Sequence, residues 1–282
     1  MLSRRFGGVA RLHGGQALET LARAHVCVVG VGGVGSWCVE GLARSGVGRL
    51  TLIDMDHVSE SNINRQLPAL ESTLGAAKIE VMRARVADIS PRCLVHSVDD
   101  FVTVDNLGEL IPQDSVLVDA IDQPRVKAAM IAQSRLRGQP VIVCGAAGAR
   151  IDPLALRRED LALTRGDALL AAVRSRLRKA HGFSREPGRK FGVPVIHSIE
   201  VPRPPPEFCE PLSALDNAGA GTSGGAGAPL ACGGYGSLVT VTAPMGFAAA
   251  AAALAFILGA EPGYARPWAV TPHPGRPPDK PG

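Results

Sequence analysis

The chain has 282 residues, of which 46% are hydrophobic and 20% are charged, a composition typical of a globular enzyme with an α/β core. Its formal net charge of +4 is too small to establish a nucleic-acid partner, although it is compatible with an anionic one. The six cysteines form no C-x-x-C pair and residues 1–15 contain no apolar signal segment, so zinc tetrads, disulfide scaffolds and secretion are disfavoured and a cytoplasmic location is expected.

The first half of the chain alternates short apolar runs with stretches of helical composition. Residues 26–29 form a β-branched run that ends in a glycine cluster, and a helical stretch follows at 36–45. Further apolar runs lie at 50–53, 93–98, 115–118 and 140–144, and further helical stretches at 76–88 and 125–136. Continuous apolar runs predict strands that are buried on both faces of a parallel sheet. We therefore predict a Rossmann-like, doubly wound α/β fold with a mainly parallel sheet, and residues 1–150 as its nucleotide-binding core.

The second half, residues 151–260, is expected to complete the same domain with mixed sheet and helix. It includes a basic helical segment at 157–190, with ten Arg or Lys residues against four Asp or Glu. This segment is either a solvated helix face or a contact surface for RNA phosphates. Residues 202–236 are rich in Pro, Gly, Ala and Ser and predict a mobile loop, and the Pro-rich residues 261–282 predict a disordered tail.

Residues 238–260 are almost free of polar side chains and are long enough to cross a bilayer. We favour a buried strand followed by a buried helix, because Pro244 and Gly246 interrupt the run and alanine contributes little to membrane insertion. Membrane association is the alternative.

A glycine cluster between the first strand and the first helix consists of Gly30, Gly32, Gly33 and Gly35. Glycines let the backbone approach phosphates there, and the helix N-terminus offers N–H donors and positive potential. The spacing also fits a dinucleotide fold, in which Asp54 or Asp56 would bind the ribose of NAD. The loop alone therefore leaves ATP and NAD open.

Four further motifs decide in favour of ATP. They are Asp54-Met55-Asp56, Ser61-Asn62-Ile63-Asn64-Arg65-Gln66, Lys78 and Asp119-Ala120-Ile121-Asp122. When a carboxylate attacks the α-phosphorus of ATP, negative charge develops on the phosphate oxygens, and Arg, Lys and a magnesium-binding Asp can neutralise it. Asp54 can hold the ribose hydroxyls. This set is expected in an enzyme that forms acyl-adenylates, and a dehydrogenase has no need of it.

In this order the motifs resemble those of the ubiquitin-activating superfamily, over roughly residues 18–148. The resemblance implies that the glycine loop clasps ATP, that Asp54 binds ribose and that Asp122 holds Mg²⁺. It implies phosphate contacts for Asn62, Arg65, Gln66 and Lys78, with Arg65, Lys78 and Asp122 acting in catalysis. Asp56 is expected to organise its loop within the nucleotide site, and Asp119 either belongs to the site or ends a strand. A homodimer is also implied.

Within the superfamily, the chain resembles the tRNA threonylcarbamoyladenosine dehydratases. It is too short for the extra domains of ubiquitin-activating enzymes, and it lacks the C-x-x-C pairs of the molybdopterin and thiamin adenylating enzymes. Segments that fit the dehydratases lie at 4–8, 32–37, 61–66, 119–122, 145–153 and 232–236, whereas 202–206, 219–227 and the Pro-rich tail depart from the pattern. The resemblance implies ATP-dependent dehydration of threonylcarbamoyladenosine in tRNA, through adenylation of its carboxylate.

Other roles remain as alternatives. Cys232 is either a catalytic thiol that forms a thioester or a small apolar residue, because intramolecular attack on the adenylate needs no enzyme nucleophile. Cys144, at a strand end, is expected to be structural. The alternative functions are adenylation of the C-terminal glycine of a sulfur-carrier protein, with a sulfur-transfer protein as partner, NAD-dependent oxidation, and an inactive scaffold subunit. Arg65 and Lys78 argue against the scaffold, whose usual signature is their loss.

Overall fold

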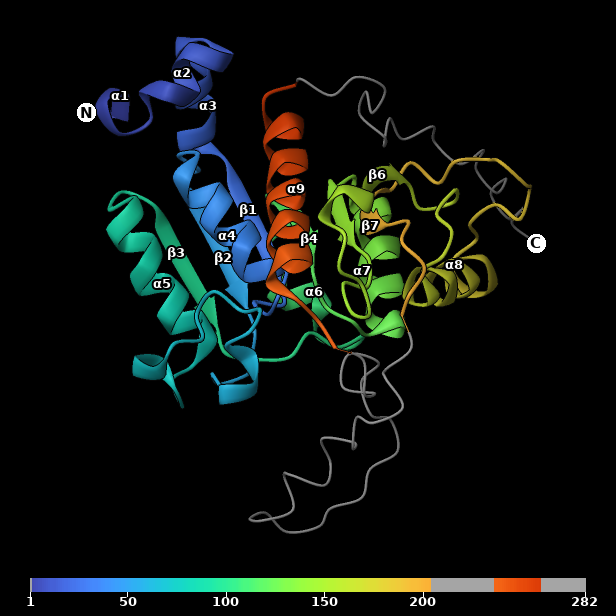
Figure 1. The fold of residues 1–282 in the computed structure, drawn as a ribbon. Coiled ribbons are helices and arrows are strands. Elements are labelled where there is room, and N and C mark those ends of the chain that lie inside the picture. The colour runs from blue at the N-terminus through green and yellow to red at the C-terminus, as the bar shows by residue number, and fades with distance from the viewer. Residues whose placement is uncertain (1, 204–235, 260–282) are drawn as a thin grey trace, which may run out of the picture.

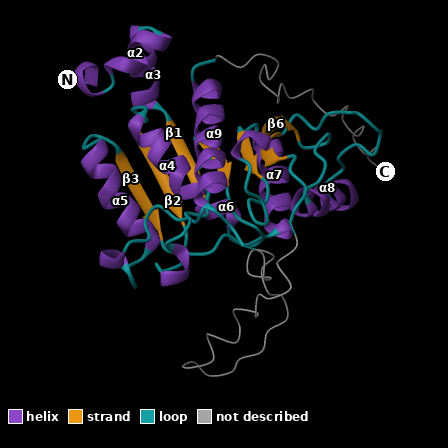
Figure 2. Ribbon diagram, viewed as in Figure 1, coloured by secondary structure: helices purple, strands orange, loops and turns teal. Residues whose placement is uncertain are grey.

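A seven-stranded sheet forms the centre of the computed structural model, which describes residues 2–203 and 236–259 (Figure 1). The strand order is β3-β2-β1-β4-β5-β7-β6, and all neighbouring strands are parallel except β6 and β7 (Figure 2). The strands are β1 (His25–Val29), β2 (Arg49–Ile53), β3 (Leu94–Val98), β4 (Val116–Asp119), β5 (Val141–Cys144), β6 (Leu156–Asp160) and β7 (Pro194–Ser198). The order reverses direction between β1 and β4, so the predicted doubly wound, mainly parallel sheet is confirmed.

Helices surround this sheet. They are α1 (Leu2–Arg5), α2 (Gly7–His13), α3 (Gly15–Arg23), α4 (Gly35–Arg44), α5 (Lys78–Ile89), α6 (Leu107–Leu110), α7 (Pro124–Arg137), α8 (Ala168–Ala180) and α9 (Val239–Ile257). The three predicted helical stretches 36–45, 76–88 and 125–136 correspond to α4, α5 and α7, whereas α1, α2, α3 and α6 were not predicted. Short 3₁₀ helices lie at Glu60–Asn62, Glu71–Thr73 and Pro153–Ala155. Helices α1–α3 lie at the end of the sheet where the strands begin (Figure 1).

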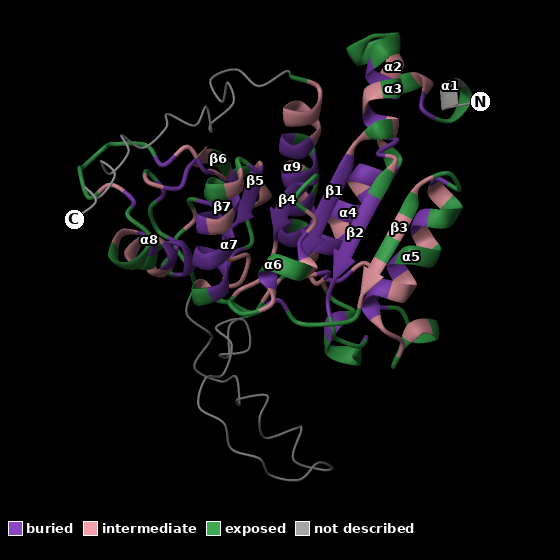
Figure 3. Ribbon diagram, turned by 180° about the vertical axis from the view of Figure 1, so that it is seen from behind, coloured by how far each residue is buried: buried purple, intermediate pink, exposed green. Residues whose placement is uncertain are grey.

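Two hydrophobic cores cover the two faces of the sheet. On β1, Val26 and Val28 point into the core that contains α4, α5 and α9, whereas Cys27 and Val29 point into the core that contains α6, α7 and α8. This alternation is that of a strand buried on both sides. Central strands β1, β4 and β5 are buried throughout, and the edge strand β3 is not (Figure 3).

The described residues 238–259 do not contain the predicted strand. Residues 239–257 form the single helix α9, which packs against α4 on the same face of the sheet (Figure 1). Pro244 stands in the second turn of α9, where its missing N–H removes one backbone hydrogen bond close to the helix start. Gly246 permits close contact, because a Cβ there would lie 2.4 Å from the Val34 carbonyl oxygen. In the described part of the chain, α9 is the one helix long and apolar enough to cross a membrane, and 44% of its most apolar window is buried inside the fold.

The basic segment 157–190 is not helical throughout. Its first residues form β6, which pairs antiparallel with β7 at the sheet edge, and only α8 is helical. Strand β6 is amphipathic in the manner of an edge strand, with Arg157 and Arg158 exposed and Asp160 buried. Almost all of the predicted mobile loop 202–236, and the predicted disordered tail 261–282, lie outside the described residues.

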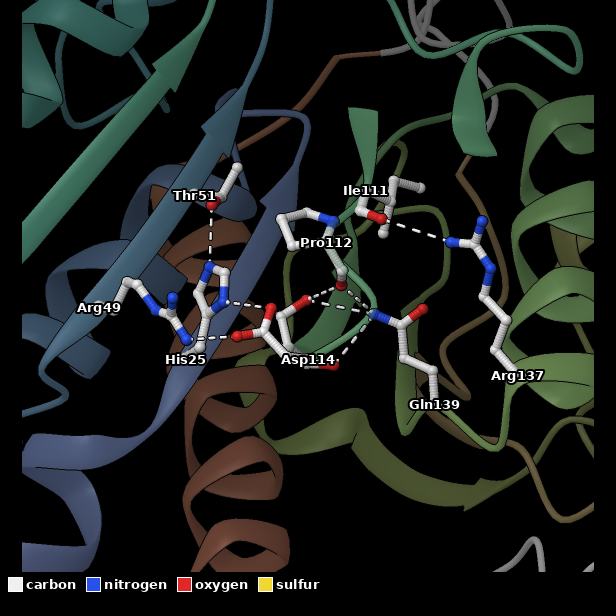
Figure 4. A network of polar contacts seen from close by, with 9 residues as sticks. His25, Arg49, Thr51, Ile111, Pro112, Asp114, Arg137 and Gln139 are labelled. Carbon is white, nitrogen blue, oxygen red and sulfur yellow. Dashed lines mark hydrogen bonds and ion pairs between the residues drawn. The ribbon is translucent and has the colours of Figure 1, made fainter. Parts of the chain in front are cut away.

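A polar network ties the first strands together at the end of the sheet opposite the glycine loop (Figure 4). The buried His25 ring contacts the Thr51 hydroxyl at 2.9 Å and an Asp114 carboxylate oxygen at 3.1 Å. Arg49 donates to the other oxygen of Asp114. Burial lowers the pKa of His25, and the Arg49 charge lowers it further, while Asp114 acts in the opposite direction. The network connects β1, β2 and the turn before β4.

Candidate active site

The predicted site residues gather at the carboxyl ends of β1, β2 and β4. The Gly30 N–H donates to the Ile53 carbonyl at 2.9 Å, and the Ala120 N–H donates to the Val29 carbonyl at 2.9 Å. These bonds bring the segments that follow the three strands into contact. In a doubly wound sheet, ligands bind in the crevice where the strand order reverses, here between β1 and β4.

Two glycines of the loop are fixed by geometry. Gly30 has a left-handed φ of 87°, which favours glycine, and a Cβ there would lie 3.1 Å from the Ala120 backbone. At Gly35, the first residue of α4, a Cβ would lie 1.8 Å from the Gly30 carbonyl oxygen. The loop therefore folds tightly onto the helix N-terminus, as a backbone that receives phosphates must.

Asp54 is built into this loop. Its side chain is buried at the end of β2, and its two oxygens accept the N–H of Val31 at 2.6 Å and the N–H of Asp56 at 2.8 Å. Burial raises the pKa of Asp54, while the backbone hydrogen bonds and the nearby Lys78 ammonium oppose that rise. Each carboxylate oxygen keeps a lone pair for a ribose hydroxyl, so the geometry fits the predicted role.

Lys78 is the first residue of α5 and is 4% exposed. Its ammonium lies 2.8 Å from an Asp56 carboxylate oxygen, and its backbone N–H donates to the Asp56 carbonyl at 3.1 Å. The ammonium is thereby directed toward the carboxyl end of β2. Asp56 is more than half exposed and holds both the lysine and the Asp54 carboxylate in place.

The Asn62 to Gln66 segment closes the other side of the glycine loop. Asn62 is buried and its side-chain oxygen accepts the Ser59 N–H at 3.2 Å, which fixes the turn. The Arg65 guanidinium donates to the Ser61 carbonyl at 2.7 Å. Gln66 lies 3.8 Å from a Cβ built on Gly32, and its buried side-chain oxygen has no partner among the described residues. A buried, unpaired acceptor beside the glycine loop is what a ligand donor would satisfy.

Two residues that sequence reasoning missed hold the Arg65 peptide. The Trp37 indole N–H donates to the Arg65 carbonyl at 3.1 Å, and the Thr242 hydroxyl donates to the same oxygen at 3.2 Å. Thr242 also approaches the glycine loop, with its methyl 3.4 Å from a Cβ built on Gly33. Asn64 adds a third link, because its amide donates to the Ser237 carbonyl at 2.8 Å. Helix α9, distant in sequence, thus positions the arginine.

The structure separates the two aspartates that follow β4. Asp119 is fully buried and accepts the Lys127 ammonium at 2.7 Å, so it belongs to an internal ion pair with no solvent access. Asp122 is half-buried and makes no hydrogen bond or ion pair with the described residues. Of the two alternatives for Asp119, the structure favours the strand-ending, structural one. The sequence did not indicate that Lys127 is buried, because a lysine within a helical stretch is usually a surface residue.

Asp122 is also the residue that fits a magnesium ion. Within the described residues, no three His, Cys, Asp or Glu side chains cluster to form a protein cage for a metal. Mg²⁺ typically takes one or two carboxylates and completes its octahedron with phosphate oxygens and water. The Asp122 carboxylate, which follows β4 and is uncommitted among the described residues, matches that donor set.

The cysteines of the described residues do not form a second reactive site. Cys27, Cys38 and Cys144 are buried and Cys93 is partly buried, and burial raises the pKa of the Cys144 thiol to about 12 and that of the Cys93 thiol to about 11. Such thiols are not thiolates near neutral pH, and Cys144 is structural by position. Cys232 lies outside the described residues, so both of its alternatives remain predictions.

Comparison with known proteins places this site in a family. A model of the ThiF family matches residues 3–271, and the chain belongs to that family. Two curated relatives are tRNA threonylcarbamoyladenosine dehydratases: one from Haemophilus influenzae, 44% identical over 86% of this chain and 89% of that protein, and one from Escherichia coli, 44% identical over 89% and 92%. The solved E. coli dehydratase in complex with ATP superimposes with a TM-score of 0.77 at 40% identity, covering 92% of this chain and 95% of that one. The same enzyme in complex with AMP gives a TM-score of 0.78 at 41% identity.

Proposed function

We infer that this chain is an ATP-dependent tRNA threonylcarbamoyladenosine dehydratase. The observation that carries this conclusion is near-full-length similarity to dehydratases of that name, one of which is solved with ATP and with AMP. The described crevice adds the physical basis, because it joins a glycine loop, an acidic ribose site and two cations at the carboxyl ends of the strands. The NAD-dependent alternative has no comparable support.

The reaction proceeds in two steps, adenylation and ring closure. A carboxylate oxygen of the threonyl group attacks the α-phosphorus of ATP, and pyrophosphate leaves. An atom of the carbamoyl group then attacks the acyl carbon, the ring closes and AMP leaves, so that the nucleoside loses one water. In this scheme Asp54 holds the ribose, the loop N–H groups hold phosphate, and Arg65 and Lys78 face the charge that grows on the phosphate oxygens.

Bound Mg²⁺ would neutralise phosphate charge and polarise the reacting phosphorus, and we propose that Asp122 is its protein ligand. Support comes from the uncommitted Asp122 carboxylate and from the internal pairing of Asp119 with Lys127. The Lys78 ammonium has three N–H donors and uses one of them on Asp56, so the other two can reach a bound phosphate.

We further propose a cytoplasmic homodimer that acts on tRNA, by resemblance to its superfamily. A sulfur-transfer protein as a partner, and contact of α9 with a membrane, have no support among the described contacts and form no part of the proposal. Light scattering at micromolar concentration tests the dimer, and a monomer would contradict it.

The function is tested by incubating the protein with ATP, Mg²⁺ and threonylcarbamoyl-modified tRNA and digesting the tRNA to nucleosides. Mass spectrometry should show ATP-dependent loss of one water from the modified nucleoside. An unchanged nucleoside, together with pyrophosphate exchange stimulated by a small protein that ends in glycine, would replace this function with the sulfur-carrier alternative.

A further inference from the structure

The chain carries an open hollow of about 330 Å³ on α8, away from the nucleotide crevice. Its lining consists of Ala171, Arg174, Ser175, Arg178, Lys179 and Arg185. Four of these six residues are cations and none is acidic. Like charges that converge on a helix surface are destabilising unless an anion joins them.

The acidic residues of the same segment do not compensate these charges, because the fold uses them elsewhere. Asp160 is 1% exposed and accepts three backbone N–H groups, from Ala162, Phe191 and Gly192. Asp167 is buried and caps the N-terminus of α8 through the Leu170 N–H. Glu159 lies 2.8 Å from the buried His197 ring. These three acidic side chains are therefore engaged in internal contacts, whereas the basic side chains of the hollow are at least partly exposed.

The exposed acid, Glu186, is also committed, since it pairs with Arg189 at 3.3 Å. Among the described residues, none of the four cations of the hollow forms an ion pair. Burial lowers the pKa of Arg174, the neighbouring Arg178 and Arg165 charges act in the same direction, and the Asp167 charge opposes them. The hollow is therefore a positive surface whose four cations are not ion-paired with any described residue.

Two of the cations are held in position before any ligand arrives. Arg174 donates to the Thr164 hydroxyl. Arg178 uses its Nε to donate to the Ser184 carbonyl at 3.2 Å, and its guanidinium lies 5.3 Å from the centre of the Phe191 ring. Its two terminal nitrogens stay available. A planar guanidinium fixed in this way presents paired N–H donors that match phosphate geometry.

The hollow is connected, through α8, to the carboxyl end of the strands, where the proposed nucleotide site lies. The Asp167 carboxylate that caps α8 also accepts the Ala146 N–H at 2.9 Å, just beyond the end of β5. Helix α8 extends from there, and at about 1.5 Å per residue Arg174, Arg178 and Lys179 lie roughly 10–18 Å along it, while Arg185 follows the end of the helix. A rigid polyanion with one nucleoside in the crevice can reach that far, whereas a free nucleotide cannot.

We propose that this hollow binds the phosphate backbone of the tRNA whose modified nucleoside enters the crevice. The inference rests on the proposed function, and it assigns substrate affinity to Arg174, Arg178, Lys179 and Arg185. RNA helices are recognised mainly through phosphates and shape, and neutralised phosphates release counterions, which makes the affinity depend on salt.

The test uses the exposed pair in the double variant Lys179→Gln/Arg185→Gln, because Arg174 and Arg178 also make internal contacts. A fluorescently labelled tRNA transcript is titrated with full-length protein at 50 and 200 mM salt. The affinity of the double variant should fall about tenfold less between these salt concentrations than that of the wild type, since two phosphate contacts are lost. The matched control Arg11→Gln/Arg92→Gln removes the same charge at the other end of the sheet and should behave as wild type.

Turnover separates failure of the surface from failure of the function. With modified tRNA, the double variant should show a raised KM for tRNA and an unchanged KM for ATP. If wild type dehydrates the tRNA while the double variant keeps its KM and salt dependence, the surface is refuted and an acidic protein becomes the better occupant. If wild type does not dehydrate the tRNA at all, the proposed function itself fails.

Discussion

The buried pair of Asp119 and Lys127 makes a sharp prediction about stability. Lys127 is fully buried, and its ammonium donates to an Asp119 carboxylate oxygen at 2.7 Å and to the Ile121 carbonyl at 2.8 Å. The substitution Lys127→Met leaves the Asp119 carboxylate buried without a counter-charge, with only the Ile121 N–H as a hydrogen-bond donor at 3.3 Å. Removing one member of such a pair typically costs about 3–5 kcal/mol, which in a protein of this size lowers the Tm by roughly 10 °C.

The double variant Asp119→Leu/Lys127→Met provides the control. It removes both charges and fills the space with apolar side chains, so its free energy of unfolding should lie within about 1–2 kcal/mol of the wild-type value. Burial raises the pKa of Asp119 and the Lys127 ammonium opposes that rise. In Lys127→Met no ammonium lowers the pKa of Asp119, so Asp119 binds a proton in the folded state on mild acidification. The loss of stability relative to wild type is therefore smaller at lower pH.

Thermal and urea unfolding of the three proteins at pH 5.5 and pH 8 measure these effects. The reasoning would be refuted if the free energy of unfolding of Lys127→Met at pH 8 lay within about 1 kcal/mol of the wild-type value, or if the double variant were as unstable as the single one. Either result would mean that water or a rearrangement, rather than the ion pair, satisfies Asp119.

Three other predictions concern the site and the sheet. Arg65→Ala and Lys78→Ala should each keep the fold and lose most turnover, on the order of a hundredfold, because the proposed function assigns both to the charge that develops on phosphate; near-normal single-turnover rates would contradict this. Thr242→Val should lower kcat with little change in KM for ATP by loosening the Arg65 peptide, and Thr242→Ser, which keeps the hydroxyl, should restore it; equal loss in both variants would assign Thr242 to packing alone. The pKa of His25 is lowered in the folded protein, so below about pH 6.5 the unfolded chain binds a proton that the folded chain does not, and the folded state loses stability as the pH decreases. Between pH 7 and pH 5 the Tm of His25→Gln should therefore decrease less than that of wild type. Parallel curves of Tm against pH would exclude His25 as the cause.

Some features of the protein follow from sequence patterns that act locally. Four-residue apolar runs, each followed by Gly or Asp, predict strands whose carboxyl ends carry polar loops, and β1, β2, β4 and β5 have that form. The glycine loop at the start of α4 was predictable because only glycine fits a left-handed turn packed against another backbone. Asp54 directly follows the second apolar run, and the order of the motifs around it and Lys78 carries the family resemblance from which their roles were predicted.

Tertiary structure decided what depends on contacts between distant segments. An apolar run without periodicity does not distinguish strand from helix, and only the close packing of Gly246 on α4 shows that 239–257 is one helix. The roles of Asp119 and Asp122 are also indistinguishable in the sequence, since both follow β4, and the buried Lys127 separates them. The same holds for the basic segment: its total charge was visible, but burial of Asp160 and Asp167 determines that the positive charge faces solvent unpaired.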